Sequence, residues 1–221
     1  MNKHLSAAAA GLLLTVGMTG AHAAGEGYVG VGIPGVIAGY ALSVHDNVTV
    51  RADYATLGSR NKNGTEEGIN YNGKVKIGRA GLFGDYFPLG SGFRLTGGVT
   101  FNQIKGELNA VTTPGGTITV GSKTVPTTGN ERFNVTVKVP DVTPFVGIGY
   151  GHKAKEKGLG FAFDLGASIG KAKVNVDTNL PQLYPGVVTQ ADVDAETAEI
   201  RDGAGKVKFI PQLSFALTYT Y

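Results

Sequence analysis

The C-terminal stretch of the chain alternates apolar and polar residues with a period of two, and this pattern most constrains the fold. From Val207 to Tyr221 the odd positions carry Val, Phe, Pro, Leu, Phe, Leu, Tyr and Tyr, while Lys, Gln, Ser and Thr occupy most even positions. Because successive side chains of a strand point to opposite faces, one face of this segment is apolar throughout. We therefore predict a long β-strand here.

The same period recurs after Gly27 and predicts eight strands. Two of them change the parity of their apolar positions, near Gly78 and near Pro140, and we expect a β-bulge at each place. Short connections (45–47, 88–91 and 152–158) alternate with long loops (58–71, 109–132 and 178–205), and we find no separable second domain. The expected strands are residues 26–33, 36–44, 48–57, 72–87, 92–108, 133–150, 159–177 and 206–221.

The glycines indicate which way the apolar face points. The chain has 35 Gly, and many lie on the polar face of the strands, where they would make room for Arg and Lys inside a narrow barrel. An apolar exterior, an even strand number and alternating loop lengths are typical of a transmembrane barrel. We predict an all-β, antiparallel up-and-down transmembrane β-barrel of eight strands. A soluble barrel of lipocalin type, with the apolar face inside, is the alternative.

The N-terminus predicts export. Residues 1–23 combine Lys3, an apolar stretch from Leu5 to Val16 and the small-residue ending Ala21-His22-Ala23, which is typical of a cleaved signal peptide. The chain also has no Cys, so disulfides and cysteine chemistry are excluded. We expect residues 24–221 to form the barrel in a bacterial envelope.

With these features the chain resembles the small outer-membrane β-barrel proteins, the group that includes outer-membrane proteins A (its membrane domain), X and W. The resemblance rests on the signal peptide and on Phe215, Leu217, Tyr219 and Tyr221 of the last strand. It implies that these four residues are an assembly signal read by the barrel-assembly machinery, although Tyr221 stands where the family more often has Phe. It also implies a bacterial outer-membrane location, with the short turns in the periplasm and the long loops outside.

The polar face carries balanced charges. Three cations and three anions are expected in the lumen, where the simplest arrangement is a paired network that plugs the barrel. A narrow path for small solutes remains open as the alternative. The six residues of this expected lumen network are Arg51, Asp53, Arg79, Asp85, Arg94 and Asp164.

Lysines gather where the long strands would project beyond the bilayer. We expect Lys74, Lys76, Lys206 and Lys208 on the lumen side of the outer mouth, and Lys171 and Lys173 on its lipid side. A basic rim suits lipopolysaccharide phosphates, although solvated lysines that keep the strand ends soluble are an equal alternative. The acidic residues of loop 178–205 either fold over this mouth or stay solvated: Asp192, Asp194, Glu196, Glu199 and Asp202.

Other function classes lack support. No basic run with interleaved aromatic residues indicates nucleic acid binding, and we expect no cofactor and no metal site. Enzymes of this barrel class generally need a His, but His45 and His152 fall in expected short turns, so we predict no catalysis. The expected function is a structural or surface-interaction role, with a porin-like channel or a route resembling that of outer-membrane protein W as the alternative, and a lipid-modifying enzyme as a remote one. The external partner is not indicated.

Overall fold

The chain forms mainly antiparallel β-strands. The computed structural model describes residues 25–66, 69–153, 157–205 and 208–221, so the expected signal peptide (1–23) lies outside the described residues. The elements are β1 (Gly25–Ile33), β2 (Gly35–His45), β3 (Val48–Glu66), β4 (Ile69–Tyr86), β5 (Phe93–Asn102), β6 (Lys105–Val111), β7 (Thr117–Val120), β8 (Lys123–Pro126), β9 (Phe133–Lys138), β10 (Val142–Tyr150), β11 (Gly158–Ile169), β12 (Lys173–Thr178), α1 (Leu180–Leu183), α2 (Gln190–Gly205) and β13 (Phe209–Thr220).

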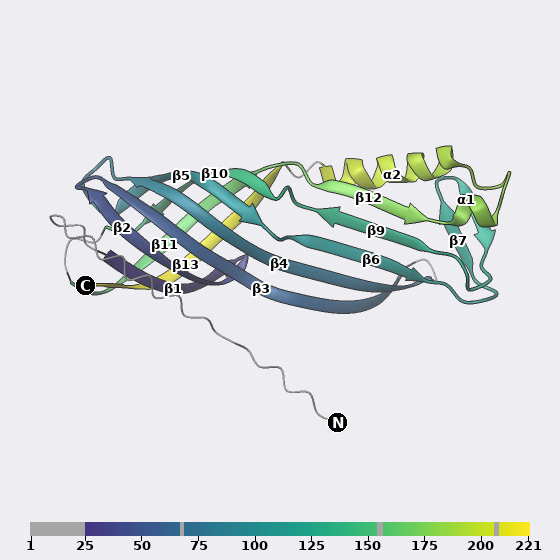
Figure 1. Cartoon of the computed structure of the whole chain (residues 1–221), viewed down its shortest axis with the longest axis horizontal. Helices are drawn as coiled ribbons and strands as arrows, with labels where there is room; N and C mark the ends of the chain where they lie inside the picture. Colours follow the sequence, from purple (N-terminus) through teal and green to yellow (C-terminus); the bar gives the residue numbers. More distant parts are fainter. Residues whose placement is uncertain (1–24, 67–68, 154–156, 206–207) are drawn as a thin grey trace, which may run out of the picture.

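The main sheet has eleven strands rather than the eight expected. Its order is β12-β9-β6-β4-β3-β2-β1-β13-β11-β10-β5, and β4 pairs additionally with β5. The pairings of β1, β2, β3, β4, β5, β10, β11 and β13 therefore run in a circuit that returns to its start. Figure 1 shows these strands at one end of the molecule, with β6, β9 and β12 continuing beside the far halves of β3 and β4. We call this second part the distal sheet.

The extra strands arise because each long expected strand is interrupted once. β5 and β6 are separated by two residues, yet both keep one register along β4, since Arg79 lies opposite Asn102 and Lys76 lies opposite Lys105. The same holds for β10 and β9 along β5 and β6. The distal sheet is thus a direct continuation of the same strand ladders, as the expected strand lengths implied.

The expected bulge at Gly78 was wrong, because β4 runs through that residue without a slip. The register irregularity lies on β3, between Thr56 and Gly58. What changes at this level is polarity, since the face of β4 that carries Arg79 continues into Ile77, Val75 and Tyr71. The expected bulge near Pro140 is likewise not seen along the neighbouring strands, because β9 on β6 and β10 on β5 keep one register. The parity change in the sequence therefore marks a boundary between two environments rather than a backbone defect.

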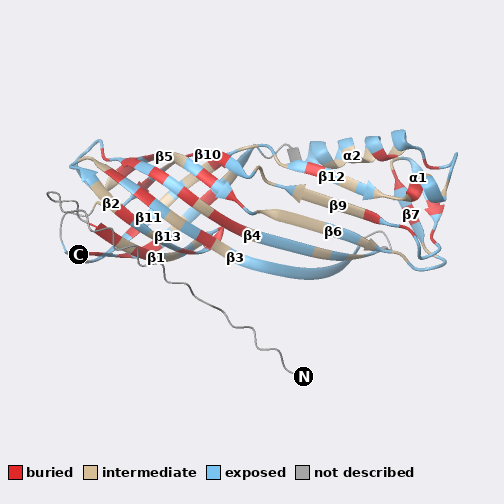
Figure 2. Ribbon diagram, in the orientation of Figure 1, coloured by how far each residue is buried: buried red, intermediate tan, exposed pale blue. Residues whose placement is uncertain are grey.

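We call the face of the circuit that carries Arg51 the inner face and the opposite face the outer face. On the side of the boundary away from the distal sheet, the outer face is apolar and exposed. Figure 2 shows buried and exposed residues alternating along these strands, as in β3, where Val50 and Tyr54 are exposed and Thr49 and Ala55 are buried. This confirms the expected division of the strands into an outward apolar and an inward polar face. Exposed apolar residues of the outer face include Val29, Val31, Leu82, Leu95, Val99, Phe101, Val146, Ile148, Phe161, Leu165, Leu213, Phe215 and Leu217.

Beyond the boundary the chain builds a second hydrophobic core, so the expected long loops are structured. Residues 58–71 lengthen the β3–β4 hairpin, 109–132 contains the β7–β8 hairpin, and 178–205 contains α1 and α2. Helix α2 packs along β12 (Figure 1). We call the distal sheet with this hairpin and the helices the distal module. Its core comprises Ile118, Val120, Val125, Phe133, Leu180, Val188 and Val193.

The acidic segment forms this helix instead of a loop over the mouth. Thr189 and Asp192 bond reciprocally at its start, as in a capping box: the Thr189 hydroxyl accepts the Asp192 N–H, and Asp192 accepts the Thr189 N–H. Glu196 accepts the N–H of Gly121 in the β7–β8 turn at 2.9 Å, which ties helix to hairpin. Among the described residues, no helix is long and apolar enough to cross a membrane.

Glu131 holds the start of β9 to α1. Its carboxylate accepts the Thr128 N–H at 2.8 Å, the Gly129 N–H at 3.0 Å and the Tyr184 hydroxyl at 2.7 Å. Burial raises the pKa of Glu131, but these hydrogen bonds to the charged form outweigh it and leave the pKa well below the ordinary value of 4.5. The ionised carboxylate therefore stabilises the distal module.

The sign of that pKa shift predicts acid sensitivity. A carboxylate whose pKa is lowered by folding contributes stability above its ordinary pKa and loses it as the pH falls below that value. We expect the distal module to lose protection from hydrogen exchange between pH 5 and pH 3, and Glu131→Gln to be less protected at pH 7 but less sensitive to acid. Parallel acid profiles for the two proteins would contradict this role.

Candidate functional site

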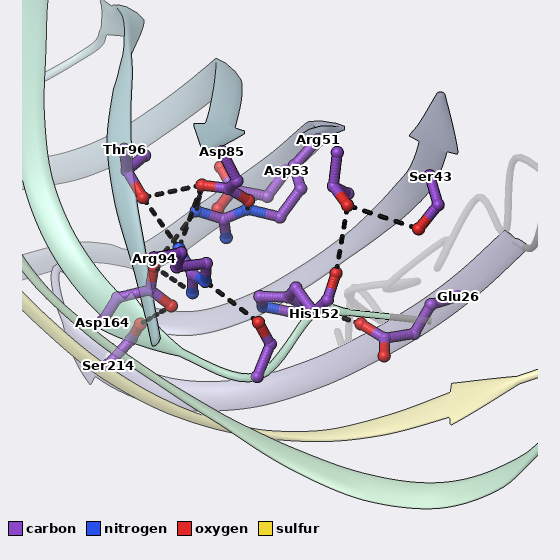
Figure 3. A network of polar contacts seen from close by, with 12 residues as sticks. Glu26, Ser43, Arg51, Asp53, Asp85, Arg94, Thr96, His152, Asp164 and Ser214 are labelled. Atoms are coloured by element: carbon purple, nitrogen blue, oxygen red, sulfur yellow. Dashed lines mark hydrogen bonds and ion pairs between the residues drawn. The ribbon is translucent and has the colours of Figure 1, made fainter. Parts of the chain in front are cut away.

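Four of the six expected network residues meet at one buried cluster on the inner face. Arg51 contacts Asp85 at 2.5 Å and Asp164 at 3.1 Å, while Arg94 contacts Asp85 at 3.0 Å and Asp164 at 2.7 Å. Thr96 donates to Asp85 and Ser214 donates to Asp164. Figure 3 shows these side chains converging from separate strands. Two guanidinium groups are thus shared between two carboxylates, which leaves the cluster neutral.

This cluster reaches from one side of the strand circuit to the other. Arg51 lies on β3 and Asp164 on β11, and the circuit separates these strands by four pairings in either direction. The ion pair between them, at 3.1 Å, therefore joins opposite walls. Arg94 on β5 has no exposed surface and also donates to the Gly151 carbonyl, so its guanidinium is held on several sides.

The remaining two network residues form a separate pair. Arg79 lies 2.9 Å from Asp53 and stacks on Phe83, with its guanidinium carbon 5.4 Å from the ring centre. Between this pair and the four-residue cluster lies a cavity of about 20 Å³, which Tyr28, Phe145 and Gln212 also line. A water molecule needs about 10 to 15 Å³, so the cavity has room for about one.

The inward glycines make room for aromatic rings as well as for arginines, whereas the sequence suggested Arg and Lys alone. A methyl group added at Gly39 would meet the Tyr28 ring at 2.4 Å, one at Gly98 would meet Phe83, and one at Gly166 would meet Phe145 at 2.4 Å. At Gly81 it would meet the Arg79 guanidinium, and at Gly149 that of Arg94. The interior is therefore filled by rings and guanidinium groups together, since both are large.

His152 belongs to this interior, which the sequence did not indicate. We expected it in a short turn, and it does follow β10, but its ring is buried and its Nδ1 lies 2.5 Å from Glu26 of β1. Its carbonyl accepts the Thr49 hydroxyl (Figure 3). The left-handed backbone of His152, with φ of 59°, turns the side chain inward. His45 lies at the exposed end of β2.

A second group that sequence analysis missed lies nearer the distal module. The Thr100 hydroxyl bonds to Thr143 at 2.7 Å and to Ser168 at 2.8 Å, and Ser168 accepts from Gln212. All four side chains are buried. Their alternation with apolar neighbours predicts an inward position, but short hydroxyl side chains carry no charge signal that would single them out.

The predicted mouth lysines do not all lie where we expected. Lys74 and Lys76 share a face of β4 with Leu82 and Tyr86, so they lie on the outer side instead of the lumen side. Lys173 pairs with Lys138 and also faces outward, as expected. The remaining three are Lys171, exposed between β11 and β12, Lys208, exposed just before β13, and Lys206, which lies outside the described residues.

The expected assembly signal lies at the far end of the circuit from the distal module. Phe215, Leu217, Tyr219 and Tyr221 are 50–60% exposed on the outer face. β13 pairs with both β1 and β11 over this stretch, so its backbone is fully engaged while its apolar side chains are not.

Comparison with known proteins identifies the fold. No protein-family model matches the chain, and no curated protein matches it. The solved structure of CarO2 from Acinetobacter baumannii matches with a TM-score of 0.56 and 16% identity, covering 90% of this chain and 98% of CarO2. CarO from the same organism matches with a TM-score of 0.51 and 15% identity, covering 90% and 97%. At these identities the likeness shows a shared all-β antiparallel fold.

Each arginine of the charge cluster contacts both carboxylates, which predicts strong coupling between Arg94 and Asp164. Arg94→Met leaves two buried carboxylates short of a partner and should destabilise the protein by about 3 to 5 kcal/mol. Asp164→Asn should also destabilise it, but the double variant should lose less than the sum, by about 0.5 to 3 kcal/mol, in urea unfolding of the lipid-inserted protein. Additive losses would show that the two groups do not act as a pair.

Proposed function

We propose that this chain is a bacterial outer-membrane protein whose eight-strand circuit is a closed transmembrane β-barrel with a plugged lumen, and that the barrel anchors the distal module outside the cell. Its role is that of a scaffold or of a surface-interaction protein. The fold shared with CarO and CarO2 supports the barrel architecture and the outer-membrane location.

The ion pair between Arg51 and Asp164 carries the proposal for the lumen. We expect a pair that joins opposite walls to obstruct a water path through the lumen. Two further side chains narrow the same level: Arg94 lies 2.7 Å from Asp164, and the Tyr28 ring centre lies 6.0 Å from the Arg51 guanidinium carbon. The neighbouring cavity has room for about one water. An eight-stranded barrel is just wide enough for its own side chains, so such filling is the expected state of a small barrel.

The exposed apolar band supports the membrane placement. Soluble proteins rarely expose contiguous apolar patches of more than a few hundred Å², whereas here every strand of the circuit contributes exposed Val, Leu, Ile, Phe or Tyr. A lipid environment covers this band and requires every backbone group to be paired, which the circuit of pairings achieves. Export through the signal peptide 1–23 and insertion through the β13 signal complete the proposal.

The polarity boundary gives a matched test of membrane placement. Leu82 and Val111 are similarly exposed, at 50% and 41%, and share the outer face, but they lie on opposite sides of the boundary. We expect Leu82→Arg to reduce the folding free energy in lipid vesicles by about 2 to 4 kcal/mol, the cost of Arg near a bilayer midplane. Val111→Arg should change it by less than about 1 kcal/mol, since Val111 would meet water. Similar effects at the two sites would contradict a membrane around Leu82.

Conductance tests the plugged lumen. The protein in a planar bilayer should be electrically silent, with insertion verified by heat-modifiable migration on gels. The neutral double variant Arg51→Ala/Asp85→Ala removes one buried pair, leaves the Arg94–Asp164 pair, and should admit ions. Discrete openings of the unaltered protein would instead favour the alternative function, a narrow channel for small solutes.

A further inference from the structure

Four lysines stand in one row across four adjacent strands of the distal sheet. Lys76 on β4 lies opposite Lys105 on β6, Lys105 lies opposite Lys138 on β9, and Lys138 lies opposite Lys173 on β12. Residues directly opposite in an antiparallel pair point to the same face. At a strand spacing of about 4.8 Å, the row extends for about 14 Å. We call these residues the lysine row.

The lysine row lies on the outer face, just beyond the apolar band. On β4, Leu82, Ala80 and Lys76 lie on the same face, because the register along β4 does not change between them. Ala80 lies opposite Phe101, which belongs to the apolar band and precedes Lys105 by four positions. Four residues correspond to about 13 Å along a strand, or about 10 Å in height for a barrel strand tilted by about 40°. With the membrane placement proposed above, the ammonium groups reach the level of the outer lipid headgroups.

Such a row opposes folding unless something compensates it. Like charges directly opposite in a sheet repel, and Lys105 and Lys138 each have a lysine on both sides. Lys105 pairs with Glu107 and Lys138 pairs with Asp141, but among the described residues neither Lys76 nor Lys173 forms an ion pair. The row therefore keeps an excess of positive charge directed away from the distal core.

Amide and hydroxyl side chains cover the same face above the lysine row. The next row contains Asn61, Lys74, Glu107, Thr136 and Asn175 in register, and the row after it contains Asn63, Asn72, Asn109, Asn134 and Asp177. Amides and carboxylates in this array offer both donors and acceptors, as needed for sugar hydroxyl groups. Moving away from the band, the face thus presents a row of cations first and then two rows in which most side chains are neutral amides or hydroxyls, together with Lys74, Glu107 and Asp177.

We propose that this face binds a phosphorylated glycolipid of the outer leaflet, with the lysine row on the phosphates and the amide rows on the sugars above them. Lysine is suited to phosphate as a point charge, and basic residues at a membrane surface attract anionic headgroups. The acyl chains then lie against the apolar band, which begins below the row. The proposal rests on the membrane placement but not on whether the lumen conducts.

The test compares two double variants of the full chain refolded in uncharged micelles. Lys76→Thr/Lys173→Thr removes the two unpaired members of the row. Lys62→Thr/Lys123→Thr is the control of equal charge, since Lys62 lies on the opposite face, across from Gly73, and Lys123 lies on β8. Bisphosphorylated lipid A is the probe, and native mass spectrometry measures its binding. Both variants are first checked for heat-modifiable migration.

We expect lipid A binding to weaken about thirtyfold in the row variant, since each basic residue near an anionic headgroup strengthens binding about fivefold. The control should stay within about twofold of the unaltered protein. Lipid A without its phosphates should bind the unaltered protein at least as weakly as the row variant binds the intact lipid, since it loses the contacts of all four lysines. Equal losses in the row variant and the control would overturn the proposal.

Two further arms separate this failure from other causes. Inorganic pyrophosphate should not displace the lipid at equal concentration, and if it does, the face takes free anions and the glycolipid proposal is wrong.

If the row variant does not refold, 0.5 M NaCl with the unaltered protein replaces it: salt should release lipid A, and undiminished binding would contradict a charge-based site. Leu82→Arg tests the membrane placement independently of all these outcomes.

Discussion

The rest of the strand circuit depends on two guanidinium groups shared between two carboxylates. Buried charges are costly unless they are paired and hydrogen-bonded, and here Asp85 receives bonds from Arg51, Arg94 and Thr96 at once. Such an arrangement fixes the distance between β3, β4, β5 and β11, because any widening separates buried ions that have few other groups to replace their partners. Glycine is then needed at the inward positions beside these groups, because the aromatic rings and guanidinium groups leave no volume for a further side chain at the same level.

The change of polarity at the level of Gly78 explains why one set of strands serves two environments. On the side of the ion-pair cluster the strands carry apolar residues outward, and on the distal side the inner face of β4 carries Ile77, Val75 and Tyr71, of which Tyr71 packs against the distal core. β4 needs no break in register for this change, because strand geometry does not depend on which face is apolar, whereas β3 has one register shift at this level, between Thr56 and Gly58. The strands thus continue across this level, while their apolar face changes from the outer side of the sheet to the inner side.

Sequence periodicity predicted the strands, their faces and the long extensions, because alternation directly reports which face is apolar. It misplaced Lys74 and Lys76 for the same reason, since a change of environment and a β-bulge leave identical patterns. All six charged residues of the expected network lie inside, as judged by their place on the polar face, but their partners depend on the circuit of strands: Arg51 meets Asp164, 113 positions away. The Glu26–His152 pair could not be anticipated, because the turn conformation of His152 places its ring inside. Helix α2 could not be anticipated either, because its position depends on tertiary packing against β12.

The long β3–β4 hairpin has a mechanical consequence. Its two strands cross the polarity boundary with eighteen residue pairs and a single register shift, between Thr56 and Gly58, and β5–β6 and β10–β9 continue beside it in one register. A force applied at the tip would load many interstrand hydrogen bonds together along the strand direction, in shear, instead of opening them one after another. A force on the distal module is therefore transmitted along β3 and β4 directly into the strand circuit.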